Sequence, residues 1–229
     1  MFISKVMKVY DDNIELVIEK LKTTGPGKIK FIFYDEDIYI DTLSIPVVKK
    51  AWIHNIINNK LIYNFDDIGK FSFSYEILTK KENKYLIVLY CINSRKNILY
   101  KSLEPKHKVV GVFLIQHCYH YFVKELVKVK DFILVFNSKK YTYVIFSYNG
   151  FLKKNIIFKN GEVEIGEILD CINEILSNED NDGTVKNTPI IMINYEKVDL
   201  LMKMLSDCSF RNMGTVDENR IIRKYVGVL

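Results

Sequence analysis

Residues 131–158, DFILVFNSKKYTYVIFSYNGFLKKNIIF, constrain the fold more than any other part of the chain. Three apolar and aromatic runs are separated there by two polar turns, Asn137–Lys140 and Asn149–Gly150. This pattern predicts three consecutive strands joined by tight turns. Such hairpins occur in sheets without a ligand and also in nucleotide-binding folds that hold phosphate at the first turn. The stretch therefore predicts a sheet and raises the question of a phosphate site.

The rest of the chain alternates between strand and helix patterns. Residues 5–10 and 13–19 are expected to form a hairpin around Asp11–Asn13, although residues 13–21 also fit a helix, and residues 28–34 and 37–44 are expected to form a second hairpin. Pro46 suits the first turn of a helix that runs to about Lys60. Further strands are expected at residues 70–78, 84–92, 108–115 and 189–194, and further helices at 94–103, 116–128, 161–177, 197–208 and 217–228.

The order hairpin sheet, helix, strand, helix recurs in each half of the chain. It predicts mixed α/β architecture with two lobes, residues 1–107 and 108–229. A chain of 229 residues with 48% hydrophobic content is long enough for two such cores. Segment 177–187 is the only stretch with the composition of a disordered loop.

Composition argues against several classes of function. The net charge is +5, but the lysines are scattered and offset by 28 acidic residues, which favours a solvated surface over a nucleic-acid-binding face. The cysteines are far apart and lie in or beside apolar runs, which predicts reduced thiols in a cytosolic protein: Cys91, Cys118, Cys171 and Cys208. The N-terminal residues do not form a targeting segment, and the longest apolar runs are too short for a membrane span.

Several groups of residues have the chemistry of candidate sites. His117, Cys118 and His120 resemble part of a zinc site, but a companion pair of ligands is missing, so a partly buried helix start is the favoured interpretation. Acids at 35–37, 41, 66–67 and 179–182 fit ordinary turn chemistry, whereas Asp131 with Glu76 is an alternative pair for a metal-dependent, ribonuclease-H-like nuclease. Neither a GxSxG elbow nor a GxxxxGK[ST] loop is present.

Several segments together resemble a known family. Residues 37–78 are similar to its strand ending in "lP", its helix and its "ydyeil" strand, TYVIFSYNGFLKKNIIFKNG at 142–161 to its strand–"nG"–strand, and the tail RIIRKYVGVL, with Gly227, to its closing helix. The family is that of the actin-like cytoplasmic proteins of type IV pilus and type II secretion assembly platforms (PilM, GspL and the bundle-forming-pilus relatives). The resemblance implies the two-lobed fold of actin and the chaperone Hsp70, which is related to ribonuclease H.

The resemblance also implies where a nucleotide would bind. Active members hold phosphates on two glycine-containing hairpin turns and seat the nucleoside on a turn with two glycines. The second phosphate turn corresponds to Asp131–Thr142, where Asn137, Ser138, Lys139 and Lys140 replace the glycine-rich loop; the first corresponds to Tyr10–Asn13, and the nucleoside turn to Asn194–Glu196. All three lack glycine, so Asp131, Asn137, Ser138, Lys139 and Thr142 are expected to be at most a vestigial loop, and neither a nucleotide nor a metal cofactor is expected.

The resemblance implies a non-enzymatic scaffold that docks a cytoplasmic assembly ATPase to inner-membrane pilus or secretion proteins. Such a protein would lie in the cytoplasm at the inner-membrane face, either as an excised domain or as a free-standing protein. An actin-like ATPase that uses Asp131, Asn137, Ser138 and Lys139 is the first alternative, and the nuclease is the second. Exposed aromatic residues are the candidates for partner contacts: Tyr141, Tyr143 and Tyr148, whereas Trp52 is expected to lie in the core.

Overall fold

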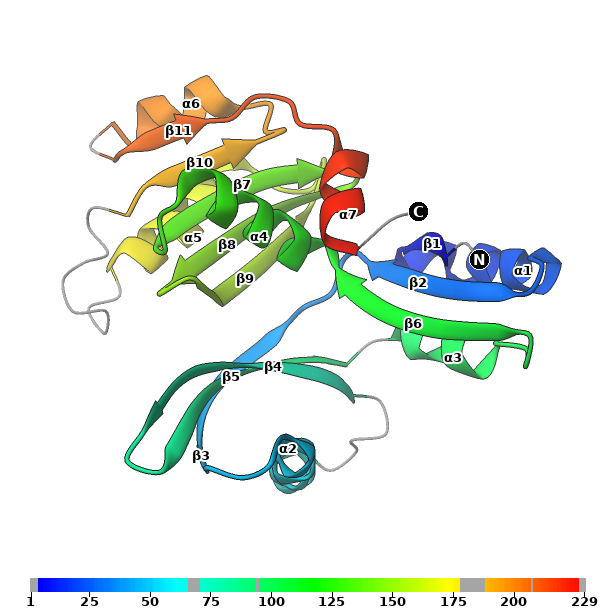
Figure 1. The fold of residues 1–229 in the computed structure, drawn as a ribbon. Helices are drawn as coiled ribbons and strands as arrows, with labels where there is room; N and C mark the ends of the chain where they lie inside the picture. Colours follow the sequence, from blue (N-terminus) through cyan, green and yellow to red (C-terminus); the bar gives the residue numbers. More distant parts are fainter. Residues whose placement is uncertain (1–3, 66–70, 94, 178–187, 207, 227–229) are drawn as a thin grey trace. The chain divides into compact units, whose positions relative to one another are not determined.

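A computed structural model describes residues 4–65, 71–93, 95–177, 188–206 and 208–226 (Figure 1). Contacts divide the chain into a larger unit, residues 1–35 with 102–229, and a smaller unit, residues 36–101. The smaller unit is thus an insertion in the larger one. The lobe boundary expected between residues 107 and 108 stays a prediction. Expected acids at 66–67 and 179–182, and Gly227, lie outside the described residues.

The first sheet of the larger unit is parallel, in the order β1-β2-β6. Its strands are β1 (Ser4–Val9), β2 (Gly27–Phe33) and β6 (His107–Leu114). Helix α1 (Ile14–Thr23) connects β1 to β2, so the expected hairpin at residues 5–19 is wrong and the helical alternative is confirmed. Val17 and Leu21, four residues apart, are the buried residues of α1, which is the spacing of one helix face.

The expected hairpin between residues 28–34 and 37–44 is also wrong. Strand β2 pairs with β1 and β6, whereas β3 (Tyr39–Pro46) belongs to the smaller unit and pairs with β5 (Lys84–Asn93). Ile29, Phe31, Ile32 and Phe33 are all fully buried. A strand that is apolar on both faces suits the centre of a parallel sheet rather than a local hairpin with one solvated face.

The second sheet of the larger unit has five strands in the order β11-β10-β7-β8-β9. The three strands predicted from residues 131–158 are confirmed as an antiparallel meander: β7 (Phe132–Ser138), β8 (Tyr141–Tyr148) and β9 (Phe151–Lys159). Strand β10 (Ile190–Ile193) is parallel to β7, and β11 (Phe210–Asn212) is parallel to β10. The three-residue β11 was missed, because it is too short to show a period.

Helices cover both faces of this sheet (Figure 1). Ile133 and Val135 of β7 share a core with α5 (Ile165–Ser177) and α6 (Val198–Met204). Phe136 points to the other face, where its ring stacks on Tyr119 of α4 (Ile115–Val127) with centroids 4.0 Å apart. Helix α7 (Glu218–Val226) packs against α4. Alternating β7 side chains therefore serve two helical layers, as a central strand requires.

The smaller unit is an antiparallel sheet with the order β3-β5-β4, where β4 is Phe71–Lys81. Helix α2 (Lys50–Asn64) buries Ile53, Ile57 and Leu61 against one face of this sheet. A short 3-10 turn (Arg95–Asn97) and α3 (Ile98–Lys101) close the unit. Two expectations are corrected: Pro46 ends β3 instead of starting the helix, and Trp52 is 60% exposed rather than part of the core.

Candidate functional site

The first phosphate turn implied by the resemblance is not formed as a hairpin. Asp11–Asn13 make a 3-10 turn that leads directly into α1. Asn13 stabilises this start, since its Oδ1 accepts a hydrogen bond from the Tyr10 amide at 2.8 Å. A turn that begins a helix cannot return the chain along β1 as a phosphate hairpin does. The residues at this position therefore do not form a cradle for phosphate.

The second turn does form, between β7 and β8, at Lys139–Lys140. Lys139 has φ of 53°, the left-handed conformation that glycine adopts without cost. The absence of glycine thus did not prevent this backbone conformation, contrary to the expectation from sequence. A lysine there carries a strain of about 1 kcal/mol and a side chain that glycine would not place over the turn.

The side chains of the β7–β8 turn are already engaged. Lys140 forms an ion pair with Asp12, and the Lys139 ammonium lies 5.2 Å from the centroid of the Tyr10 ring. The Ser138 hydroxyl donates a hydrogen bond to Oε2 of Glu218. The groups that would contact a phosphate here instead contact protein, and Glu218 adds a negative charge that repels an anion.

Glu218, in the first turn of α7, joins three parts of the larger unit. Its Oε1 accepts hydrogen bonds from Lys8 of β1 and from the Tyr34 hydroxyl, each at 2.7 Å, in addition to the bond from Ser138. Burial raises the pKa of Glu218, but the bonds from Lys8, Ser138 and Tyr34 outweigh it and hold the pKa below its usual value. The carboxylate is therefore ionised and fully used in bonding.

A row of aromatic rings in contact, most of them stacked, runs across the same region. The ring of Tyr10 lies between Tyr34 and Tyr141, with centroid distances of 4.3 and 6.5 Å. The row continues from Tyr141 through Tyr143, Phe136 and Tyr119, with distances of 6.3, 4.6 and 4.0 Å between successive rings. Tyr143 is fully buried in it, so its expected role as an exposed partner residue is wrong. The rings thus connect the ends of β1 and β2 with β8, β7 and α4.

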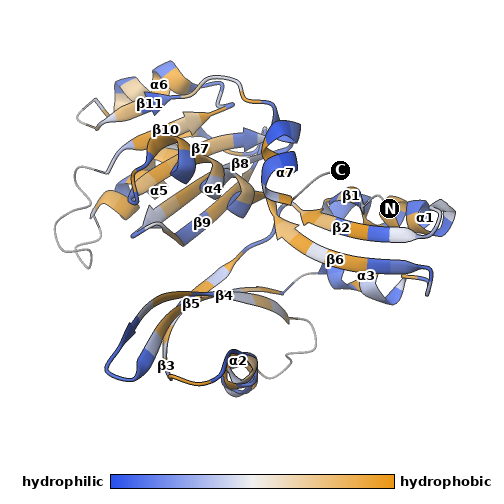
Figure 2. Ribbon diagram, in the orientation of Figure 1, coloured by the Kyte–Doolittle hydropathy of each residue, from blue (hydrophilic) through white to orange (hydrophobic). Residues whose placement is uncertain are grey.

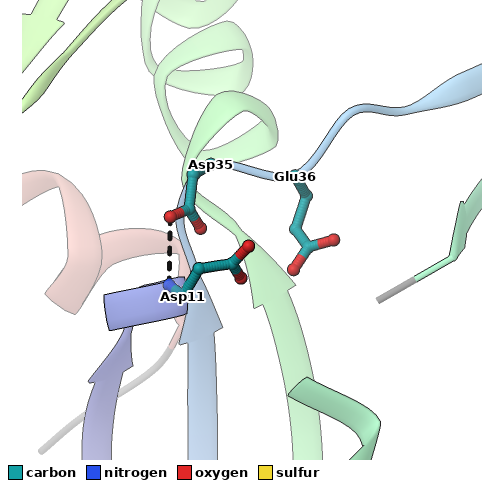
Figure 3. Close-up of side chains that lie close together, drawn as sticks. All are labelled: Asp11, Asp35 and Glu36. Atoms are coloured by element: carbon teal, nitrogen blue, oxygen red, sulfur yellow. Dashed lines mark hydrogen bonds between the residues drawn. The ribbon is translucent and has the colours of Figure 1, made fainter. Parts of the chain in front are cut away.

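The carboxylate of Asp35, just after β2, adds to these contacts (Figure 3). The Asp11 amide donates a hydrogen bond to Oδ2 of Asp35 at 3.0 Å. The same oxygen accepts a bond from the Tyr141 hydroxyl at 2.8 Å. Glu36, also drawn in Figure 3, begins the smaller unit and accepts a bond from Lys96 at 2.6 Å. The acidic character of this end of β1 and β2 further disfavours phosphate.

The structure separates the residues of the expected vestigial loop. Asp131 precedes β7 and accepts a bond from the Asn149 amide, so it stabilises the β8–β9 turn at the opposite end of the strand from Ser138 and Lys139. Asn137 and Thr142 do lie together, since the Thr142 hydroxyl is 2.7 Å from the Oδ1 atoms of both Asn137 and Asn160. Asp131 thus cannot act together with the other four residues.

Two neighbouring pockets remain beside the β7–β8 hairpin. One has a volume of about 320 Å³ and is bounded by the hairpin base and Tyr195–Lys197, and the other, of about 420 Å³, is bounded by Lys8, Lys139, Asn194 and Glu218. Asn137, Asn160 and Glu196 line both. The second pocket is thus lined by the β7–β8 turn, whose side chains already contact other residues of the protein. Its lining also includes the carboxylates of Glu196 and Glu218.

The residues of the candidate zinc site and of the candidate nuclease pair lie in environments that do not form either site. His120 Nε2 lies 2.9 Å from Ser147 Oγ, and Ser147 in turn donates to the Lys130 carbonyl, so His120 donates to Ser147. Burial lowers the pKa of His117 to about 4 and of His120 to about 3, which keeps both rings neutral. Glu76 lies on β4 of the smaller unit, whereas Asp131 caps a turn of the larger unit.

No helix in the described part of the chain combines the length and apolar character that crossing a membrane requires. No protein-family model matches the sequence, and the search of curated proteins also gave no match. The fold, by contrast, is shared with solved structures.

A PilM–PilN type IV pilus biogenesis complex matches 93% of this chain and 77% of its own, with a TM-score of 0.59 and 6% identity. An actin-like ATPase-fold protein of unknown function from Bacteroides thetaiotaomicron matches over 93% and 80%, with a TM-score of 0.54 and 10% identity. The cytoplasmic domain of EpsL, an inner-membrane component of the type II secretion system of Vibrio cholerae, matches over 92% and 79%, with a TM-score of 0.50 and 9% identity. The chain has the actin-like fold of these proteins, as the sequence resemblance implied.

Proposed function

We propose that this chain is a non-enzymatic scaffold of a type IV pilus or type II secretion assembly platform. It would dock a cytoplasmic assembly ATPase to inner-membrane components and would lie at the cytoplasmic face of that membrane. The likeness to PilM–PilN and to EpsL supports a role in this kind of machinery.

One observation favours a scaffold over an ATPase. The β7–β8 turn, where a triphosphate would be held, is bonded to the 3-10 turn after β1 through Lys140–Asp12 and to α7 through Ser138–Glu218. A nucleotide would have to break both contacts and approach Glu218, which lies in the same pocket. Breaking charge-assisted hydrogen bonds and placing phosphate near a carboxylate both oppose binding.

Thermal unfolding with and without millimolar ATP and Mg²⁺ tests this point. We expect no change in Tm, because a ligand that does not bind the native state does not stabilise it. A rise in Tm that Ser138→Ala or Lys139→Ala abolishes would establish the ATP-binding alternative instead. Mg²⁺ alone and AMP with Mg²⁺ are the matched controls for effects of the ion and of the nucleoside.

The platform role is tested by cross-linking a tagged chain in cells of its native organism. We expect recovery of a secretion-type ATPase together with an inner-membrane pilus or secretion protein. Recovery of neither, from a tagged chain shown to be folded, would overturn the proposal, whatever the result with ATP. The two experiments therefore separate the loss of nucleotide binding from the identity of the system.

A further inference from the structure

The end of the smaller unit where β3 meets the β4–β5 turn gathers lysines from two parts of the chain. Lys49 and Lys50 follow β3, and Lys80, Lys81 and Lys84 flank the turn. The segments are joined, since Pro46 is the register partner of Lys84 and the Val47 amide donates to the Asn83 carbonyl at 3.0 Å. These five residues are called the lysine tip below.

The lysine tip is exposed and strongly positive. All five of its lysines are exposed. The acid within residues 46–52 and 77–86 is Glu82, so five lysines against one glutamate give a formal charge of +4. Glu82 lies 3.9 Å from Lys81, and both side chains are more than 80% exposed, so this pair neutralises the tip only weakly. Figure 2 shows the hydrophilic end of the β4–β5 hairpin.

Large apolar side chains lie next to these lysines in the chain. Trp52, in the first turn of α2, is 60% exposed, and its amide donates to the Lys49 carbonyl at 2.8 Å. Ile77 and Leu86, just before and after the turn segment, are 44% and 37% exposed. Transfer of such apolar side chains from water to an apolar environment is favourable, so their contact with the interfacial region of a membrane would stabilise a bound state.

We infer that the lysine tip binds an anionic membrane surface, with Trp52 entering the headgroup region. A cluster of four or more lysines is attracted to anionic lipids, each by about 1 kcal/mol. Tryptophan prefers the interface between headgroups and acyl chains. The tip has lysine and no arginine, so it lacks the planar fork suited to bidentate recognition of a phosphopeptide or nucleic acid. This activity goes beyond the proposed scaffold role and does not depend on it.

Trp52 is the single tryptophan of the chain, so its fluorescence reports directly on the environment of the lysine tip. The purified full chain is mixed with phosphatidylcholine vesicles, or with vesicles in which phosphatidylglycerol replaces part of the phosphatidylcholine. We expect co-sedimentation and a blue shift of Trp52 emission with the anionic vesicles alone, both reversed by high salt. Lipids carrying a quencher at the headgroup level should quench the emission.

Matched variants decide the assignment. Lys80→Gln with Lys81→Gln and Lys84→Gln should weaken binding to anionic vesicles by at least about tenfold. The same change at the exposed Lys20, Lys22 and Lys28 of the larger unit removes equal charge and should leave most of the binding intact. Equal loss in both triple variants, or an unchanged Trp52 emission, would overturn the inference. Binding to an acidic polypeptide without binding to anionic vesicles would also overturn it and assign the tip to a protein partner.

Discussion

The ammonium of Lys8 lies 2.7 Å from Oε1 of Glu218, although the two residues are 210 positions apart in the chain. This ion pair joins the first strand of the chain to its last described helix. Both side chains are less than one third exposed. The same carboxylate also accepts hydrogen bonds from the hydroxyls of Tyr34 and Ser138. One acidic residue of α7 therefore connects this helix with the N-terminal sheet and with the β7–β8 hairpin.

Glu218→Gln should lower the free energy of unfolding by about 1–3 kcal/mol, because the amide cannot accept three charge-assisted bonds. Urea denaturation measures this change. Glu125→Gln, which removes the exposed pair with Lys224 on the neighbouring helices, is the matched control and should have little effect. Equal losses of unfolding free energy in the two variants would show that Glu218 stabilises the fold no more than an exposed ion pair does.

The pH dependence of the Glu218 contribution has a definite sign. The folded-state pKa of Glu218 lies below its ordinary value of 4.5, so the unfolded chain takes up the proton first as the pH falls. The stabilisation is complete above pH 4.5 and is lost as the pH falls through the folded-state pKa. The difference in unfolding free energy between wild type and Glu218→Gln should therefore shrink in acid. A constant difference down to low pH would contradict this assignment.

His120 should make the free energy of unfolding depend on pH in a higher range than Glu218 does. Burial lowers its folded-state pKa from 6.5 to about 3, so between these values the unfolded state binds a proton that the folded state does not. Stability should fall below pH 6.5 by about 1.4 kcal/mol per pH unit for this one group. His120→Gln keeps a donor for Ser147, and the difference in slope between wild type and variant measures the effect. Parallel pH profiles would rule it out.

Tyr195 and Tyr119 should respond in opposite ways to removal of the hydroxyl. The Tyr195 hydroxyl is buried and has no hydrogen-bond partner among the described residues, so Tyr195→Phe should leave the unfolding free energy unchanged or raise it by up to about 1 kcal/mol. The Tyr119 hydroxyl accepts a bond from Asn194 at 3.3 Å, so Tyr119→Phe should lower it by about 0.5–1.5 kcal/mol. Chemical denaturation of the two variants side by side gives the comparison, and a larger loss for Tyr195→Phe would contradict the hydrogen-bond assignment.

Replacing only one partner of the Lys96–Glu36 ion pair in the smaller unit should lower the free energy of unfolding strongly. Its atoms are 2.6 Å apart, and the side chains are 1% and 6% exposed. Lys96→Met leaves a buried carboxylate and should lower the unfolding free energy by about 3–5 kcal/mol. Combining it with Glu36→Leu should restore much of the loss. A double-mutant cycle in urea measures the coupling, and strictly additive losses would show that the pair is not coupled.

Local pattern alone predicted much of the second sheet. The meander at residues 131–158 has two tight turns and β-branched runs, so its pairing depends on neighbouring residues, and it was predicted correctly with helices α4 and α5. The actin-like fold was implied by the family resemblance, which rested on the order and spacing of such segments. The pairing of β2 with β6 did not, because these strands are separated by the whole smaller unit and parallel pairs leave no local turn signal.

The sequence by itself determined which turns lack glycine, and therefore that the phosphate turns of the resemblance are altered. Only the tertiary structure decided what replaces them. Ionic and aromatic contacts between Lys8 and Glu218, Asp12 and Lys140, and Tyr10 and Tyr141 join residues more than a hundred positions apart. Such contacts depend on side-chain geometry after the chain has folded, and no period or spacing in the sequence encodes them. The same reason explains why Asp131 seemed part of the turn in sequence and lies at the other end of β7 in the structure.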